Sequence, residues 1–398
     1  MFKTPDERKQ FFEDNPDVNF LRLHWVDFFG ILRARVITRT RAIYLATMMK
    51  SYHISSGCMS IPIYADSPNI SEETTELCRL EPDWGSLEVC GFNPTHASVM
   101  CCVSYSHGEY GPYSKCPRIF LSNNIPPAGR DEPLILVGFE LQFVFLDKAG
   151  NNNVEKSTDP IVGHSMMSGL RDKNLVVIEE IVAAIQVSGR EVWHFHTQAP
   201  GQFEIALGPR PPIEAADGLN DASRNDPYYQ STPWTSGNNV PTADLDWPAE
   251  YLPHARLRFF AGIPSQLKPL CALGLASYDS YEHTVTESEP GSDSKPTGQW
   301  VGWGTRNKEF PIRQLEPNRW EFRFLDATAN IYLFLGAVLA VGIKSMEGKK
   351  QSLVPSDCSL LPSRLSPEET ERQLKKFGIT EEMPQSFEDR AGFSQTGK

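Results

Sequence analysis

The chain has 398 residues, of which 40% are hydrophobic and 22% are charged, and its formal net charge at pH 7 is −12. This length is enough for one large core or two domains, and the composition is that of an ordinary globular protein. The excess of acidic residues argues against general nucleic-acid binding, because contacts to phosphates need clustered Lys and Arg. We therefore expect no nucleic-acid partner.

The 8 cysteines are spread along the chain without a Cys-x-x-Cys pair, and residues 1–16 are polar and charged. This pattern is not that of a zinc ribbon, a thioredoxin motif or a signal peptide. The most apolar run, residues 331–343, is too short to span a bilayer and predicts a buried helix. We therefore expect a cytoplasmic protein with reduced cysteines and no membrane partner.

The first predicted elements are strands. Residues 18–40 alternate like two strands joined at Phe29-Gly30, and further strand-like runs lie near 86–91 and 97–104. Alternation with a period of two is typical of strands with one buried face. We therefore expect a β-rich N-terminal domain over residues 17–105, and the proline-containing stretch that follows it, GPYSKCPRIF, marks a boundary.

Helices and strands alternate in the rest of the chain. The expected elements, in chain order, are a buried strand (132–147), a helix that ends at a glycine (166–189), a strand (191–208), a helical region from Ala255, a strand (318–325), the apolar helix (331–343) and a capped helix in the charged tail (366–378). Residues 209–253 are rich in Pro, Asn, Asp, Ser and Gly, a composition that cannot bury much apolar surface. We therefore expect this segment to be irregular and exposed.

Carboxylates recur on the predicted buried strands. Glu140 and Gln142 are two positions apart and so share one face of a strand, as Glu321 and Arg323 do on another strand, while Glu204 lies on a third. A buried carboxylate without a partner is costly, and a hard cation such as Mg²⁺ needs oxygen ligands of this kind, often shared with phosphate. The pattern favours a carboxylate–metal–phosphate site, and glutamates that face solvent are the alternative.

Six motifs, in order along the chain, resemble those of the glutamine synthetase family, and most closely its fungal branch of developmental-signal proteins. They are HWVDFFGILRARVI, CPRIFL, GFELQF, APGQFEIALGP, WGTRNKEFPIR and WEFRFLDATANIYL. The resemblance covers most of the chain. It implies an α+β fold, with a small β-grasp-like domain over 17–105 and a catalytic domain over 113–398. It also implies that the catalytic domain is a curved antiparallel sheet flanked by helices, shortened near 209–253 and at the C-terminus.

The resemblance also implies a reaction. The family joins an amine to a carboxylate, here the γ-carboxylate of glutamate or of an analogue, through an acyl-phosphate formed from ATP. Divalent Mg²⁺ or Mn²⁺ holds the nucleotide. By motif position, the metal ligands are Glu140, Glu204 and Glu321, Arg313 and Lys308 contact the nucleotide phosphates, and Arg313 and Arg323 are catalytic, with Arg323 meeting the substrate carboxylate. Small-molecule substrates and a homo-oligomer are implied in the same way.

Several positions depart from the family pattern. Gln142 stands where the family has a second glutamate, and Thr197 or Gln198 stands where it has the glutamate ahead of Ala-Pro-Gly-Gln. Ser280 replaces a substrate-binding arginine, Lys308 replaces the first arginine of a pair, and residues 209–253 contain no His-x-His motif. Two hypotheses therefore stand: a ligase with an altered substrate, and a catalytically inactive relative with a regulatory, scaffold or developmental-signalling role.

Overall fold

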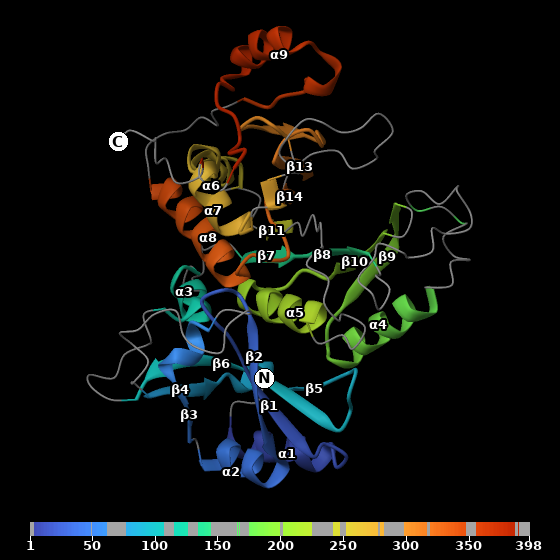
Figure 1. Cartoon of the computed structure of the whole chain (residues 1–398), viewed down its shortest axis with the longest axis vertical. Coiled ribbons are helices and arrows are strands. Elements are labelled where there is room, and N and C mark those ends of the chain that lie inside the picture. The colour runs from blue at the N-terminus through green and yellow to red at the C-terminus, as the bar shows by residue number, and fades with distance from the viewer. Residues whose placement is uncertain are drawn as a thin grey trace. The chain divides into compact units, whose positions relative to one another are not determined.

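The computed structural model shows a mixed α+β chain that divides into two compact units (Figure 1). Unit 1 comprises Met1–Asn123, Arg171–Val192 and Ala216–Ser231, and unit 2 comprises Asn124–Leu170, Trp193–Ala215 and Thr232–Lys398. The residues that the structure describes are 4–48, 50–61, 77–106, 115–125, 134–144, 165, 167, 175–199, 202–224, 242–246, 252–277, 279–281, 298–316, 319–347, 356–386 and 389. The boundaries implied by the resemblance, 17–105 and 113–398, stay a prediction.

Unit 1 is built on one mixed sheet. Its elements are α1 (Pro5–Asp14), β1 (Phe20–Val26), β2 (Leu32–Thr38), α2 (Arg39–Met48), β3 (Tyr52–Ser55), β4 (Leu77–Pro82), β5 (Glu88–Val89), β6 (His96–Tyr105), α3 (Pro117–Asn123), α4 (Leu175–Val187) and most of α5 (Pro212–Arg224). The strand order is β2-β1-β6-β4-β3, with β5 also paired to β6. The predicted hairpin is confirmed, because β1 and β2 pair antiparallel from Phe20↔Thr38 to Val26↔Leu32 around Gly30, whose φ is 76°.

The core of unit 1 forms where α1 and α2 pack against this sheet. Phe12 of α1 and Leu45 of α2 are fully buried together with Leu21 and Leu23 of β1. Helix α1 begins with a capping box, in which the side chain of Thr4 accepts from the amide of Glu7 and the side chain of Glu7 accepts from the amide of Thr4. Local capping and burial of the apolar face therefore stabilise the same helix.

Unit 2 contains two sheets and a group of helices. One sheet has the order β8-β10-β9, from Glu140–Val144, Gln202–Leu207 and Val192–Ala199. The other has the order β12-β13-β14-β11-β7, from Trp303–Thr305, Ile312–Glu316, Arg319–Phe322, Thr242–Asp246 and Leu134–Gly138. The helices are α6 (Leu252–Ser265), α7 (Leu267–Gly274), α8 (Ile331–Glu347) and α9 (Pro367–Leu374). In these sheets the pairs β8–β10, β7–β11, β11–β14 and β13–β14 are antiparallel and β12–β13 is parallel, in agreement with the predicted fold class.

The two long predicted strands are each divided in two. Residues 132–147 form β7 and β8, which separate at the buried Phe139 and enter different sheets. Residues 191–208 form β9 and β10, which lie side by side in one sheet. A continuous apolar pattern looks the same whether it forms one long strand or two consecutive strands. The sequence therefore did not show these breaks.

The prediction of an irregular 209–253 segment is wrong in two places. Residues Pro212–Arg224 form helix α5, and Thr242–Asp246 form β11, which pairs with both β7 and β14. Helix α5 begins at Pro212, the helical position at which a proline costs least. Its buried face includes the polar side chains of Asp217, Asn220 and Asp221. The other residues of the segment lie largely outside the described part of the chain.

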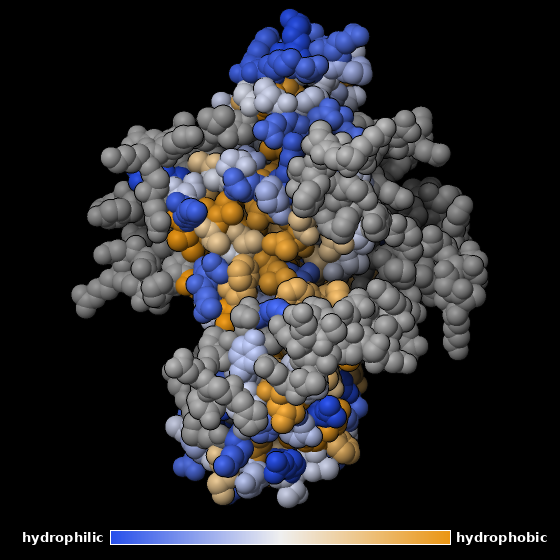
Figure 2. Space-filling view, turned by 60° about the vertical axis from the view of Figure 1, so that its left-hand side comes forward, coloured by the Kyte–Doolittle hydropathy of each residue, from blue (hydrophilic) through white to orange (hydrophobic). Residues whose placement is uncertain are grey.

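Helix α8 is the predicted apolar helix, extended to Glu347. It packs closely on α6, because a Cβ at Gly342 would lie 2.2 Å from the ring of Phe259. Figure 2 shows hydrophobic residues, in orange, at the surface around α6, α7 and α8, in keeping with the half-buried Leu333 and Ala337 of α8. Within the described residues, no helix is long and apolar enough to cross a membrane.

Candidate functional site

The antiparallel strands β8 and β10 bring together the first group of predicted site residues. Glu204 of β10 lies opposite Gln142 of β8, and Ala206 lies opposite Glu140. Because Glu140 and Gln142 are two positions apart, both side chains belong to one face of β8. The amide Nε2 of Gln142 donates a hydrogen bond to Oε2 of the buried Glu204 at 2.6 Å. Gln142 is therefore a direct partner of a predicted metal ligand.

Strands β13 and β14 bring together the second group. Arg313 lies opposite Glu321 in the register, and its guanidinium Nε forms an ion pair with Oε2 of Glu321. Nε of Arg323 lies 3.6 Å from the other oxygen of the same carboxylate. This carboxylate thus bridges two guanidinium groups, and both Glu321 and Arg323 are buried.

The two groups belong to one electrostatic cluster within unit 2. Burial, together with the neighbouring carboxylates of Glu204 and Glu321, raises the pKa of Glu140 to about 7. Burial also raises the pKa of Glu321, and the charge of Glu204 adds to this rise while the nearby Arg313 opposes it. The carboxylates of Glu204 and Glu321 both raise the pKa of Glu140, so the three side chains lie close in space. That they form one functional site stays a prediction. Their individual roles stay predictions.

Arg323 and Lys308 are held differently. Arg323 lies just after β14, and burial lowers the pKa of its guanidinium. Its Nη1 donates to the backbone carbonyl of Lys308, and its amide donates to the carbonyl of Pro311 at 2.8 Å. The side chain of Lys308 is exposed. The predicted substrate-binding arginine is therefore fixed in place, whereas the predicted phosphate-binding lysine is at the surface.

Ser280 occupies the position predicted for a substrate-binding arginine in the family pattern. It is buried, and its hydroxyl donates to the carboxylate of Asp326. The same hydroxyl lies 3.0 Å from that of Ser277 and accepts from the Ser277 amide at 3.1 Å. These contacts hold the loop that follows α7. The hydroxyl of Ser280 therefore has hydrogen-bond partners within the protein at the position where the family pattern has an arginine.

Two histidines of this region were not predicted as site residues. His194 and His196 are two positions apart on β9, and their rings stack with centroids 5.6 Å apart. Nε2 of His196 lies 3.2 Å from Oε1 of Glu204. The signal was present in the sequence as His-Phe-His, because alternate residues of a strand share a face. A His-x-His motif, which residues 209–253 lack, is thus present at 194–196.

The residues of this region fit a divalent cation. Glu140, Glu204 and Glu321 are largely buried oxygen donors whose mutual repulsion a cation would relieve. Arg313 at present supplies positive charge to Glu321 and would compete with a cation there. The side chain of Gln198, one of the two residues that can stand where the family has a glutamate, lies outside the described residues. The cluster can therefore hold a cation through Glu140 and Glu204 most directly.

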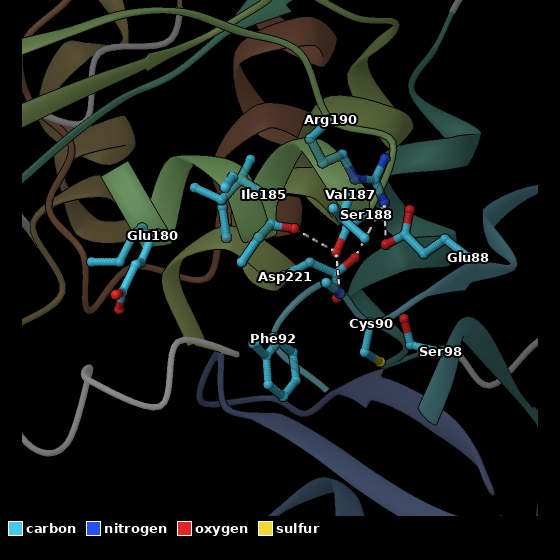
Figure 3. Close-up of a pocket in the computed structure, with 15 residues that line it drawn as sticks. Glu88, Cys90, Phe92, Ser98, Glu180, Ile185, Val187, Ser188, Arg190 and Asp221 are labelled. Carbon is cyan, nitrogen blue, oxygen red and sulfur yellow. Dashed lines mark hydrogen bonds and ion pairs between the residues drawn. The ribbon is translucent and has the colours of Figure 1, made fainter. Parts of the chain in front are cut away.

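A second cluster of ionisable residues lies in unit 1, beside a cavity of about 400 Å³ (Figure 3). Nη2 of Arg190 lies 2.9 Å from Oε1 of Glu88 and 3.1 Å from Oδ2 of Asp221. Burial, reinforced by the charge of Asp221, raises the pKa of Glu88 to about 10. The guanidinium of Arg190 thus pairs with two carboxylates. Because Glu88 stays protonated, the group does not carry the second negative charge that two ionised carboxylates would have. None of the predicted site residues belongs to this cluster.

Comparison with known proteins agrees with the motif resemblance. Residues 231–389 match the family described as glutamine synthetase, catalytic domain. The chain is 27% identical over 414 residues to protein fluG of Emericella nidulans, in an alignment that covers 96% of this chain and 44% of fluG. It is 23% identical to type-1 glutamine synthetase 1 of Dictyostelium discoideum, covering 91% of this chain and 81% of that one. The chain thus spans less than half the length of fluG.

The fold is also shared with solved structures. The chain superposes on that of a GmaS/ADP complex with a TM-score of 0.73, covering 97% of this chain and 89% of the other. The sequence identity is 18%, so this likeness concerns the fold alone. Together with the sequence relatives, it confirms the predicted α+β glutamine synthetase architecture.

Proposed function

We propose that this chain, a protein of the glutamine synthetase family, is an ATP-dependent ligase that joins an amine to a carboxylate. The observation that carries the proposal is the buried cluster of Glu140, Glu204 and Glu321, which three strands from two sheets bring together. Isolating such charges from water without a ligand is costly, so a cluster of this kind has a functional explanation more readily than a packing one. The γ-carboxylate of glutamate or of an analogue is the proposed acid.

In this proposal the side chains of the cluster bind the cations, the phosphates and the acid substrate. Glu140, Glu204 and Glu321 hold divalent cations, Mg²⁺ or Mn²⁺. Such cations, when bound, neutralise charge on the phosphates of ATP. Arg313 contacts the transferred phosphoryl group once it leaves its ion pair with Glu321. Arg323, held rigid by the Lys308 carbonyl, presents a planar fork to the substrate carboxylate.

The alternative is a protein of the same fold with a regulatory, scaffold or developmental-signalling role. Two observations favour it: the hydrogen bond from Gln142 satisfies Glu204 without a cation, and Ser280 is tied to Asp326 where the family pattern has a substrate-binding arginine. Neither removes the carboxylates or the arginines, so the ligase remains the better supported function. The altered position at Ser280 favours an analogue of glutamate over free glutamate as the acid.

Turnover of ATP distinguishes the two. Phosphate release should be measured with glutamate and its N- or C-blocked analogues, each with ammonia and with primary amines, in Mg²⁺ and in Mn²⁺. We expect release only when both acid and amine are present, with one amide formed per phosphate. The reaction should proceed without addition of any other protein, and assembly into a homo-oligomer should be tested in the same sample by light scattering.

Matched variants make the result specific. Glu140→Gln and Glu321→Gln should each lower turnover by about 100-fold or more, because a group that stabilises charge in the transition state contributes about that much. Glu316→Gln, at the exposed end of β13, is the control and should be unchanged. If the protein binds ATP but no acid and amine pair gives phosphate, the non-catalytic alternative holds instead.

A further inference from the structure

The histidine pair of β9 forms a cluster with Glu204. One nitrogen of His194, one nitrogen of His196 and one carboxylate oxygen of Glu204 all lie within 4.8 Å of one another. The two rings are nearly parallel, with 6° between their planes, since both project from the same face of the strand. Three potential ligands therefore come from two neighbouring strands of one rigid sheet.

The hydrogen bonds of His196 define which atom faces Glu204. Its Nδ1 lies 3.0 Å from the carbonyl oxygen of Thr197, which can only accept, so Nδ1 carries a proton and donates. Its Nε2 lies 3.2 Å from Oε1 of Glu204, which also accepts when ionised. The two atoms face each other, so a single cation placed between them would contact both Nε2 of His196 and Oε1 of Glu204.

The surrounding contacts are those that orient metal ligands. An imidazole that binds a metal through one nitrogen usually donates its other N–H to a carbonyl or carboxylate, as His196 does to Thr197. The carboxylate of Glu204 is oriented in the same way, because Gln142 donates to Oε2 and leaves Oε1 directed at His196. Each of these partners fixes a ligand without occupying the atom that would bind the metal.

We infer that His194, His196 and Glu204 bind one Zn²⁺ ion, with a fourth position open to water or substrate. Zinc bonds of about 2.0–2.1 Å place tetrahedral ligand atoms about 3.3 Å apart. The His196 and Glu204 atoms are already 3.2 Å apart, and the widest separation, at most 4.8 Å, has to close by about 1.5 Å. His194 is exposed, so rotation of its side chain can supply that movement.

The ligand set selects the class of metal. Imidazole nitrogen suits zinc, copper, iron and nickel, whereas Mg²⁺ prefers carboxylates, carbonyls and water. The site therefore differs in chemistry from the all-carboxylate set of Glu140, Glu204 and Glu321, although it shares Glu204. The inference does not rest on the proposed ligase activity, because a catalytically inactive protein with this geometry would bind the ion equally.

Cobalt substitution tests the site on the full chain without an affinity tag. Co²⁺ reports four-coordinate nitrogen and oxygen ligation through visible absorption bands. We expect one equivalent to bind, Zn²⁺ to displace it, and a large excess of Mg²⁺ to leave it in place. The double variant His194→Ala, His196→Ala should lose the bands. His53→Ala removes an exposed histidine from β3 and should keep them.

Two further variants separate positioning and activity from binding. Gln142→Leu should weaken Co²⁺ binding about 10–100-fold, the usual effect of removing a group that orients a metal ligand. Glu321→Gln should abolish turnover of ATP and keep the Co²⁺ absorption bands. Metal binding is therefore measured independently of ligase activity, and a negative ligase assay does not affect this test. Circular dichroism should show that each variant folds. Equal Co²⁺ binding by the wild type and the double-histidine variant, or no binding by the wild type, would show that the two histidines and Glu204 do not form a metal site, and the inference would be wrong.

Discussion

Glu88 is a carboxylate whose environment keeps it protonated. It shares Arg190 with Asp221, and burial is the largest cause of its raised pKa of about 10 (Figure 3). The other titratable groups nearby are His24, whose Nδ1 lies 3.5 Å from Oδ1 of Asp221, and Cys90, whose own pKa burial raises to about 11. Burial alone would raise the pKa of Asp221 too, but the His24 hydrogen bond and the Arg190 charge hold it at about 2. The proton of the pair therefore resides on Glu88.

This assignment predicts how stability changes with pH. Folded Glu88, with its pKa raised to about 10, keeps its proton up to that pH, whereas the unfolded chain releases it near the ordinary glutamate pKa of 4.5. Between these values the unfolded state binds fewer protons, so the contribution of Glu88 to stability is complete below pH 4.5 and is lost as the pH rises towards 10. Glu88→Gln mimics the protonated form and should remove this loss, which urea unfolding at pH 5.5, 7.0 and 8.5 would measure.

The variant should therefore be at least as stable as the wild type at pH 8.5, with a flatter dependence on pH. Glu180→Gln is the matched control, since Glu180 also lines the cavity but is exposed. Its stability profile should run parallel to that of the wild type. A parallel profile for Glu88→Gln as well would show that Glu88 ionises normally in the folded state.

Among the residues of the candidate site, the sequence singled out the carboxylates and not the imidazoles. Glu140 and Glu321 could be found because a charged residue interrupts an apolar strand, which is rare without a purpose. His194 and His196 lie on a strand whose pattern is mixed, and their ring orientation depends on contacts with Thr197 and Glu204 that come from folding. The departure at Gln142 was visible in the sequence, but its hydrogen bond to Glu204 was not.

At the scale of elements, α3 and α5 are joined by a buried ion pair within unit 1. Nε and Nη2 of Arg118 donate to Oδ1 and Oδ2 of Asp217 at 3.0 and 2.8 Å, and Nη2 also donates to Asp83 at 2.6 Å. Arg118 and Asp217 are both buried. This pair explains why α5 could not be predicted: its polar residues resemble a loop, and the partners that allow their burial lie about a hundred positions away in the sequence.

Removing Asp217 should therefore destabilise the protein strongly. Asp217→Ala removes the buried carboxylate from the buried Arg118 guanidinium and leaves the half-exposed Asp83 beside it, and breaking a buried pair in this way costs about 3–5 kcal/mol. The control is Arg372→Ala on α9, which removes an equally bidentate but exposed pair with Glu369. Its unfolding midpoint in urea should not change measurably, because solvent screens exposed pairs. Equal effects of the two variants would contradict the importance of burial here.

The other predicted elements agree with the structure wherever local patterning was strong. The β1–β2 hairpin, α8 and the capped α9 each combine a clear period with a terminating signal. The divisions between β7 and β8 and between β9 and β10 depend on which sheet receives each strand. That choice is made by non-local pairing, so no local pattern in a single sequence reveals it.

At the scale of the whole molecule, the compact units are assembled from segments that are distant in the chain. Unit 1 needs α4 and most of α5 from beyond residue 170 in addition to residues 1–123. A Cβ at Gly91 would lie 1.8 Å from the carbonyl oxygen of Ala184 in α4, so the turn after β5 and this helix are in direct contact. The order of motifs could indicate the family fold, but it could not show that the N-terminal sheet depends on later helices.

This interleaving predicts that residues 1–123 do not form a stable domain alone. The fragment lacks Asp217, Arg190 and the helices that bury Arg118 and Glu88, and small units with incomplete cores are marginal. Urea unfolding should show a lower and broader transition than the full chain. Arg118→Met provides the decisive comparison. In the full chain it removes the Arg118 guanidinium from the buried Asp217 and should be strongly destabilising. In the fragment it should change much less, since Asp217 is absent. A sharp transition for the fragment, with the same sensitivity to Arg118→Met, would show that the N-terminal sheet folds independently of α4 and α5.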